Sequence, residues 1–186
     1  MPVVPLLKET EDKMIKAVES AKYEFSKIRT GRASTALLDA IHVEAYGSSM
    51  TIKQVGNVSI PDPRTLAIQP WDASLLGAIE KAILKSDLGI TPNNDGKIIR
   101  ITLPQLTEER RHDLVKVVRK LAEEGRIAIR TIRRHTIETL KKLEKDGKVP
   151  EDEGKHNEKK VQDIHDKYIK LIDEALHKKE AEIMEV

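Results

Sequence analysis

The sequence predicts an α+β protein: a long antiparallel three-helix bundle with an inserted small β/α/β sandwich domain. In three separate stretches, apolar residues recur at alternating steps of four and three, the spacing of helices that pack along one another. Between the first two stretches the character changes, because six of the nine glycines and five of the eight prolines lie between residues 31 and 106. Short β-rich runs replace the helical pattern there. We therefore expect a bundle domain formed by residues 1–30 and 105–186 and an inserted domain at 31–104.

The first helix is expected at about residues 5–29. Its apolar positions are Met14, Val18, Ala21, Phe25 and Ile28. These positions form an apolar seam along one face of the helix, and partner helices must cover it.

Within the inserted domain we expect three strands and one helix. The strand-like runs are residues 41–46, 64–68 and 97–101, and turn residues such as Pro61, Asp62 and Pro63 bound them. The helix covers roughly residues 74–86, and Gly89 is a plausible C-terminal stop for it.

The second and third helices are expected to be long. Thr107 can cap a helix whose first turn carries two glutamates, and Gly147 can end it, which gives about 38 residues. Pro150 and the acids after it open the third helix, which runs nearly to Val186. The expected seams are Leu114, Val118, Leu121, Gly125, Ala128, Ile132, Thr136, Thr139 and Leu143 in the second helix, and Val161, Ile164, Tyr168, Leu171 and Ala175 in the third.

Two short connections join the inserted domain to the bundle, and we expect them to form a two-strand hinge. Glycine frees one backbone and proline fixes the other, while few contacts need cross between the domains. A rigid junction is the alternative. The candidate hinge residues are Thr30, Gly31, Leu103, Pro104, Gln105 and Leu106.

Composition narrows the possible functions. Lys and Arg total 33 against 31 for Asp and Glu, so any RNA binding must be local rather than that of a general polycation. The absence of cysteine excludes disulfides, thiol nucleophiles and Cys-ligated zinc. Neither a secretory signal nor a long apolar stretch is present, so we expect a cytoplasmic protein that does not bind membranes.

Catalytic motifs are absent from the sequence. It contains no phosphate-binding glycine loop, no dinucleotide-binding fingerprint, no zinc-protease motif and no nucleophile elbow. None of the six histidines makes a ligand pair at helical spacing. We therefore expect no enzymatic activity, no metal, no cofactor and no small-molecule substrate.

The most informative stretch lies in the second helix, between Glu124 and Glu138. The thirteen positions between these glutamates contain four arginines and no acid. At 100° per residue, a stripe of arginines spans about 60° around the helix axis. It lies well over 90° around the helix from the expected seam. It consists of Arg119, Arg126, Arg130 and Arg133. A guanidinium can bond a phosphate bidentately, so the stripe predicts RNA binding, and a merely solvated helix face is the alternative.

Five segments resemble, in order and spacing, the signature stretches of bacterial ribosome recycling factors. They are residues 28–33, 46–47, 86–89, 106–111 and 126–134, so the resemblance covers essentially the whole chain. The sequence departs from the family pattern at Thr35, Thr131 and His135. None of these departures removes a charge that is expected to touch RNA.

The resemblance implies a translation factor that binds the post-termination ribosome and contacts rRNA of the large subunit. Together with elongation factor G, which hydrolyses GTP, such a factor splits the ribosome into subunits for a new round of initiation. The matching segments add Arg29, Arg32, Arg110 and Arg134 to the candidate RNA-binding residues.

Two alternatives from other functional classes remain. A chaperone-associated nucleotide exchange factor also joins long helices to a small β domain, but its helices pair between chains. The three seams within this chain predict a monomer instead. An enzyme that uses the inserted domain is the second alternative, and a pocket with convergent titratable groups would favour it.

Overall fold

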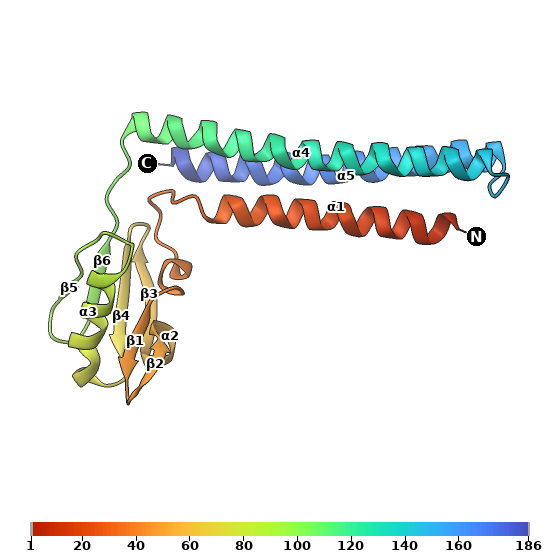
Figure 1. The fold of residues 1–186 in the computed structure, drawn as a ribbon. Helices are drawn as coiled ribbons and strands as arrows, with labels where there is room; N and C mark the ends of the chain where they lie inside the picture. The colour runs from red at the N-terminus through yellow and green to blue at the C-terminus, as the bar shows by residue number, and fades with distance from the viewer. Residues whose placement is uncertain (1, 186) are drawn as a thin grey trace. The chain divides into compact units, whose positions relative to one another are not determined.

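A computed structural model describes residues 2–185 of the chain, which forms two compact units. One unit spans Met1–Arg29 and Thr107–Val186, and the other spans Thr30–Leu106. The predicted α+β fold class is confirmed: one unit is a bundle of long helices and the other contains the β-sheets (Figure 1).

The bundle consists of α1 (Val3–Ser26), α4 (Glu108–Lys145) and α5 (Glu151–Met184). The helices lie side by side, and α4 runs antiparallel to the other two (Figure 1). Helix α4 has 38 residues, the length that its start and stop signals predicted. Its cap is also as expected, because the backbone N–H of Arg110 donates to Thr107 Oγ1 at 3.2 Å.

The expected seam of α1 is confirmed for Met14, Val18, Ala21 and Phe25, which are buried. The seam of α4 was predicted wrongly near its middle. Ala128 is exposed, and the neighbouring Ile129 is buried instead. Because α4 packs against both α1 and α5, its buried face is wider than one heptad seam and is rotated from the predicted one.

Helix α5 shows the same kind of error. Ile172 and Leu176 are buried, whereas the predicted Leu171 and Ala175 are only partly buried. The buried face of α4 observed in the structure lies closer to the arginines than the face that the sequence predicted.

The inserted unit has two antiparallel sheets. Strands β1 (His42–Ala45) and β2 (Ser48–Thr51) form a hairpin, and a four-stranded sheet has the order β3-β4-β6-β5. The latter strands are β3 (Gly56–Asp62), β4 (Thr65–Pro70), β5 (Asn93–Asn94) and β6 (Ile99–Thr102). The α-helices of the inserted unit are α2 (Ile52–Val55) and α3 (Leu76–Lys85). One-turn 3-10 helices cover Thr35–Leu38 and Ala73–Leu75.

The three predicted strands and the predicted helix correspond to β1, β4, β6 and α3. The sequence did not predict β2, β3, β5 or α2. These elements are short or rich in Ser, Asn and Pro, and the strands lack the apolar alternation that marks a half-buried strand.

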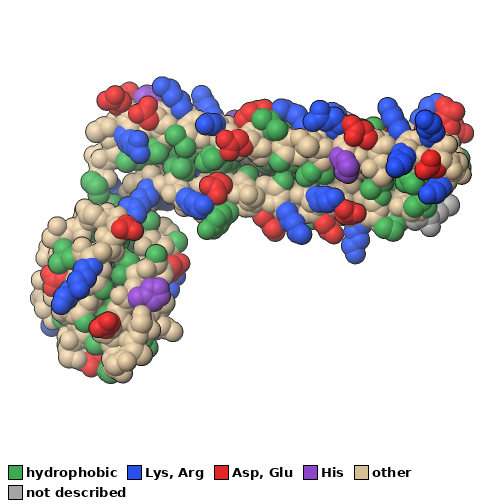
Figure 2. Space-filling model, viewed as in Figure 1, with side chains coloured by type: hydrophobic (Ala, Val, Ile, Leu, Met, Phe, Trp, Pro, Cys, Tyr) green, Lys and Arg blue, Asp and Glu red, His purple; other side chains and the backbone are tan. Residues whose placement is uncertain are grey.

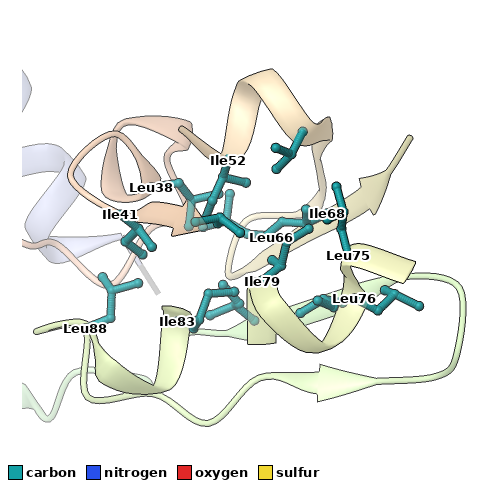
Figure 3. Close-up of a cluster of buried hydrophobic side chains, with 14 of the residues drawn as sticks. Leu38, Ile41, Ile52, Leu66, Ile68, Leu75, Leu76, Ile79, Ile83 and Leu88 are labelled. Carbon is teal, nitrogen blue, oxygen red and sulfur yellow. The ribbon is translucent and has the colours of Figure 1, made fainter. Parts of the chain in front are cut away.

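The inserted unit has a hydrophobic core of its own, shown in Figure 3. Leu66 and Ile68 of β4 meet Ile79 and Ile83 of α3, and all four side chains are fully buried. The other residues of this core are distributed over the inserted unit, from Ala33 to Leu103. This core lies entirely within the inserted unit.

Gly56, at the start of β3, provides a test of this packing. A Cβ there would lie 2.7 Å from the carbonyl oxygen of Gln69 and 2.9 Å from Cα of Pro70, both on the paired strand. We expect Gly56→Ala to destabilise the inserted unit by about 1 to 3 kcal/mol, because backbone atoms would have to move. Trp71, the only tryptophan, is already 70% exposed, so hydrogen exchange of the amides paired between β3 and β4 is the measurement that reports unfolding of this unit. Far-UV circular dichroism mainly reports the bundle.

The matched control is Gly77→Ala in α3. A Cβ added to this helical glycine would meet open space, so the change should be neutral or stabilise by up to about 1 kcal/mol. Unchanged exchange rates of these amides in Gly56→Ala would contradict the close approach of Gly56 to β4.

Candidate nucleic-acid interface

The candidate RNA-binding arginines are distributed over both units. Helix α4 carries Arg110, Arg119, Arg126, Arg130, Arg133 and Arg134. Arg29 follows α1 in the bundle unit, Arg32 belongs to the inserted unit, and both are exposed. Arg110 is exposed in the first turn of α4, about 35 Å along the helix from Arg133 at 1.5 Å per residue. The structure therefore does not gather all eight into one cluster.

Three of the arginines do come together. Arg130, Arg133 and Arg134 line a shallow depression of about 320 Å³ on α4, together with Ile127 and Thr131. Ile127 is 52% exposed, so it gives the depression an apolar surface. The Thr131 hydroxyl donates to the Ile127 carbonyl at 2.9 Å and is thereby directed along the helix. An apolar patch among guanidinium groups can accommodate a sugar or base while the arginines bond phosphates.

Arg134 is the most available of these cations. Its side chain is exposed, and no carboxylate within residues 2–185 pairs with it. It can therefore bind an anion without first breaking an ion pair.

Arg119 and Arg126 are held along α5 instead. Arg119 Nε lies 2.7 Å from Glu180 Oε1, and Arg126 Nη2 lies 2.6 Å from Asp173 Oδ1. The side chain of Arg126 is only 21% exposed, so the predicted position of the stripe, well away from the buried seam, is wrong for this residue. Arg126 lies about 60° around α4 from the buried Ile129, which places it at the edge of the contact with α5.

Glu123 joins two of the arginines. Its carboxylate accepts from Arg130 Nη1 at 2.7 Å and from Arg126 Nη1 at 3.1 Å. The hydrogen bond from Arg130 has the larger effect on Glu123. Together with the one from Arg126 it holds the pKa of Glu123 below its ordinary value. Figure 2 likewise shows acidic and basic side chains interspersed along the visible face of the bundle. Solvent screening makes exposed pairs of this kind weak, so a phosphate can replace the carboxylate at Arg130.

Arg133 lies between the depression and α5. Its Nη1 donates to Gln162 Oε1 at 2.7 Å, and its Nε is buried. The sequence did not single out Gln162, Asp173, Glu180 or Glu123 as partners. Helical periodicity gives no register between helices, so no signal in the sequence could have paired them.

The expected hinge residues lie at the two ends of the segment that forms the inserted unit, Thr30–Leu106. Gly31 has a φ of +76°, and a Cβ on it would lie 3.3 Å from Leu106 Cγ, so the two connections run side by side. Leu103 is buried, and its N–H donates to the Arg64 carbonyl at 2.8 Å. Leu103 is therefore fixed to the inserted unit, which leaves Thr30, Gly31, Pro104, Gln105 and Leu106 as the candidates that can move.

Metal ligands and membrane segments were also sought. Residues 2–185 contain no group of three His, Asp or Glu side chains placed to hold a metal ion. No helix in the described part of the chain combines the length and apolar character needed to cross a membrane.

Known proteins resemble this chain over nearly its full length. The family model for ribosome recycling factor matches residues 21–184. The ribosome-recycling factor of Carboxydothermus hydrogenoformans is 56% identical over 181 residues, which cover 97% of this chain and 98% of that protein. That of Heliobacterium modesticaldum is 53% identical over 179 residues, covering 96% and 97%.

Solved structures agree with the sequence relatives. A solution structure of ribosome recycling factor is 44% identical and superimposes with a TM-score of 0.79, covering 100% of this chain and 99% of that one. The T. thermophilus ribosome recycling factor, described with E. coli elongation factor G bound to the E. coli post-termination complex, is 48% identical with a TM-score of 0.66 and full coverage of both chains. This chain therefore belongs to the ribosome recycling factor family.

Proposed function

We propose that this protein binds the post-termination ribosome and, together with elongation factor G and GTP, splits it into subunits that can initiate again. The observation that carries the proposal is family membership over both structural units. In addition, a relative with 48% identity is described with elongation factor G at the post-termination complex. The proposal places the protein in the cytoplasm, where ribosomes work.

The bundle would provide the contact with large-subunit rRNA. Arginine suits this role because its planar guanidinium bonds phosphate oxygens bidentately. The depression around Ile127 supports it, since three arginines line one surface there. The proposed RNA-binding residues are Arg29, Arg32, Arg110, Arg119, Arg126, Arg130, Arg133 and Arg134.

No enzymatic step is assigned to this chain. In the proposed cycle the GTP is hydrolysed by elongation factor G, and the factor responds by a change in the arrangement of its parts. The protein would therefore act without a cofactor or small-molecule substrate.

We expect the protein to work as a monomer. Helices α1, α4 and α5 contact one another within a single chain, so each apolar seam has its partner there. Sedimentation of the purified protein measures its mass, and a stable dimer would instead favour the chaperone-associated exchange factor.

The direct test mixes purified protein, elongation factor G and GTP with post-termination ribosomes. Light scattering should fall as subunits separate, and a sucrose gradient should show free subunits. Omitting the protein, omitting elongation factor G, or replacing GTP by a non-hydrolysable analogue should each prevent splitting. Ribosomes that remain intact in the complete mixture would refute the proposed function.

The hinge can be tested at Gly31. In Gly31→Val a β-branched residue would occupy a positive φ and crowd Leu106, so the connection should stiffen or shift. We expect the splitting rate to fall on the order of tenfold, the effect of roughly 1.4 kcal/mol of added strain, while ribosome affinity changes little.

Gly96→Val is the matched control for backbone strain. Gly96 also has a positive φ, +91°, and lies in the inserted unit, but a Cβ there meets open space. Equal losses of binding and splitting in Gly31→Val, or an equal splitting defect in Gly96→Val, would argue against a hinge at Gly31.

A further inference from the structure

Arg133 differs from its neighbours in the way α5 holds it. Arg119 and Arg126 pair across the helices with the carboxylates of Glu180 and Asp173. Arg133 instead donates from Nη1 to the side-chain amide oxygen of Gln162 at 2.7 Å. Its Nε is buried and meets no acceptor in the described part of the chain. The guanidinium is therefore packed and bonded without a counter-charge in direct contact.

The orientation of the Gln162 amide is fixed by its other partner. Gln162 Nε2 donates to Asp166 Oδ1 at 2.8 Å. An ionised carboxylate only accepts hydrogen bonds, so the amide nitrogen must face Asp166 and the amide oxygen must face Arg133. Hydrogen bonds from His165 and then Gln162 keep the pKa of Asp166 below its ordinary value, and the nearby charges of His165 and Arg133 lower it further. Asp166 is therefore within electrostatic range of Arg133, although Gln162 is the residue that bonds it.

His165 completes this arrangement. Its Nδ1 lies 2.9 Å from Asp166 Oδ1 and 3.3 Å from Gln162 Nε2, and its side chain is only 13% exposed. Asp166, which lies one turn beyond Gln162 on α5, is thus held by its neighbour His165. The acceptor that Gln162 presents to Arg133 is oriented through bonds that α5 makes with itself.

A neutral acceptor suits an arginine that must bind a phosphate. A carboxylate would orient the guanidinium equally well but would cancel the charge that attracts the phosphate. Arg133 also lines the depression around Ile127, so the same side chain reaches both Gln162 and the candidate RNA surface.

We infer that Gln162 is a positioning residue for Arg133, which it orients for an rRNA phosphate through a neutral hydrogen bond. The inference rests on the proposed function. Asp166 and His165 support it by fixing the amide. Gln162 itself is not assigned a contact with RNA.

A double-mutant cycle tests the inference. Affinity for purified large ribosomal subunits is measured for the wild type, Gln162→Leu, Arg133→Ala and the double variant. We expect Gln162→Leu to weaken binding by about three- to tenfold, less than the loss of a direct hydrogen bond to a charged group, because the Arg133 guanidinium remains but is no longer oriented. The double variant should bind no more weakly than Arg133→Ala alone, because Gln162 acts only through Arg133.

Gln162→Glu tests the importance of neutrality. It keeps an acceptor oxygen for Arg133 but adds a charge, so binding should weaken and the logarithmic salt slope should fall by up to about 0.7 to 0.9. His177→Leu is the control for placing leucine on α5, because His177 is exposed and lies about 22 Å along the helix at 1.5 Å per residue. Thermal unfolding of every variant separates affinity from stability.

The outcomes are distinguishable. If Gln162→Leu weakens binding by the same factor with and without Arg133, the residue is only structural and the inference is wrong. Tighter binding by Gln162→Leu, or no effect of Arg133→Ala, would also overturn it. Wild-type behaviour of Gln162→Glu would overturn the role of the neutral amide. A wild-type protein that fails to bind large subunits would refute the proposed function itself.

Discussion

Arg133→Ala is expected to weaken binding to the large ribosomal subunit by about 1 to 3 kcal/mol, the range of charge-assisted hydrogen bonds. The guanidinium lines the depression on α4, and among residues 2–185 it hydrogen-bonds neutral Gln162. Its charge is therefore available to a phosphate. Losing one phosphate contact should also lower the logarithmic salt slope by something near 0.7 to 0.9.

The fold should tolerate this substitution. The variant loses one hydrogen bond to Gln162, which contributes on the order of 1 kcal/mol, and alanine is the better helix former. Thermal unfolding measured beside the salt series would show whether weaker binding reflects lost structure.

Lys170→Ala is the control for this prediction. Lys170 lies on α5 with a side chain that is 78% exposed and 3.9 Å from Glu174, so it has the position of an ordinary solvated charge. If Arg133→Ala binds like Lys170→Ala, the arginines of α4 form only a solvated face and the RNA-binding assignment is wrong.

Removing the inserted unit should abolish subunit splitting while leaving a folded bundle. Joining Arg29 to Thr107 through a short flexible linker retains α1, α4 and α5 with all their mutual contacts. The connections approach each other where Gly31 meets Leu106, so a few residues should bridge the gap. The core of the inserted unit is formed by residues 33–103 and is removed as a whole.

The shortened protein should be monomeric and strongly helical by circular dichroism, and should bind ribosomes weakly through α4. Splitting with elongation factor G and GTP should fall to the level seen without any factor. An unfolded product would show that the inserted unit completes the core of the bundle. Retained splitting would show that this unit is dispensable.

The helices of the bundle could be predicted from the amino-acid sequence. Thr107, the two glutamates after it and Gly147 marked both ends of α4, because capping and chain reversal depend on residues next to one another. The change in glycine and proline content likewise marked the insertion. Short polar strands such as β3 and β5 were missed because their pairing depends on distant partners.

The contacts of the arginines could not be predicted, because they depend on how the helices pack. A heptad pattern reports spacing within a helix, but the rotation of α4 against two partners is set by packing, and Ile129 rather than Ala128 is buried as a result. That rotation brings Arg126 to Asp173 and Arg133 to Gln162. The stretch of α4 without acids in sequence therefore has Asp173 of α5 beside it in space, because side chains on neighbouring helices meet only when the bundle assembles.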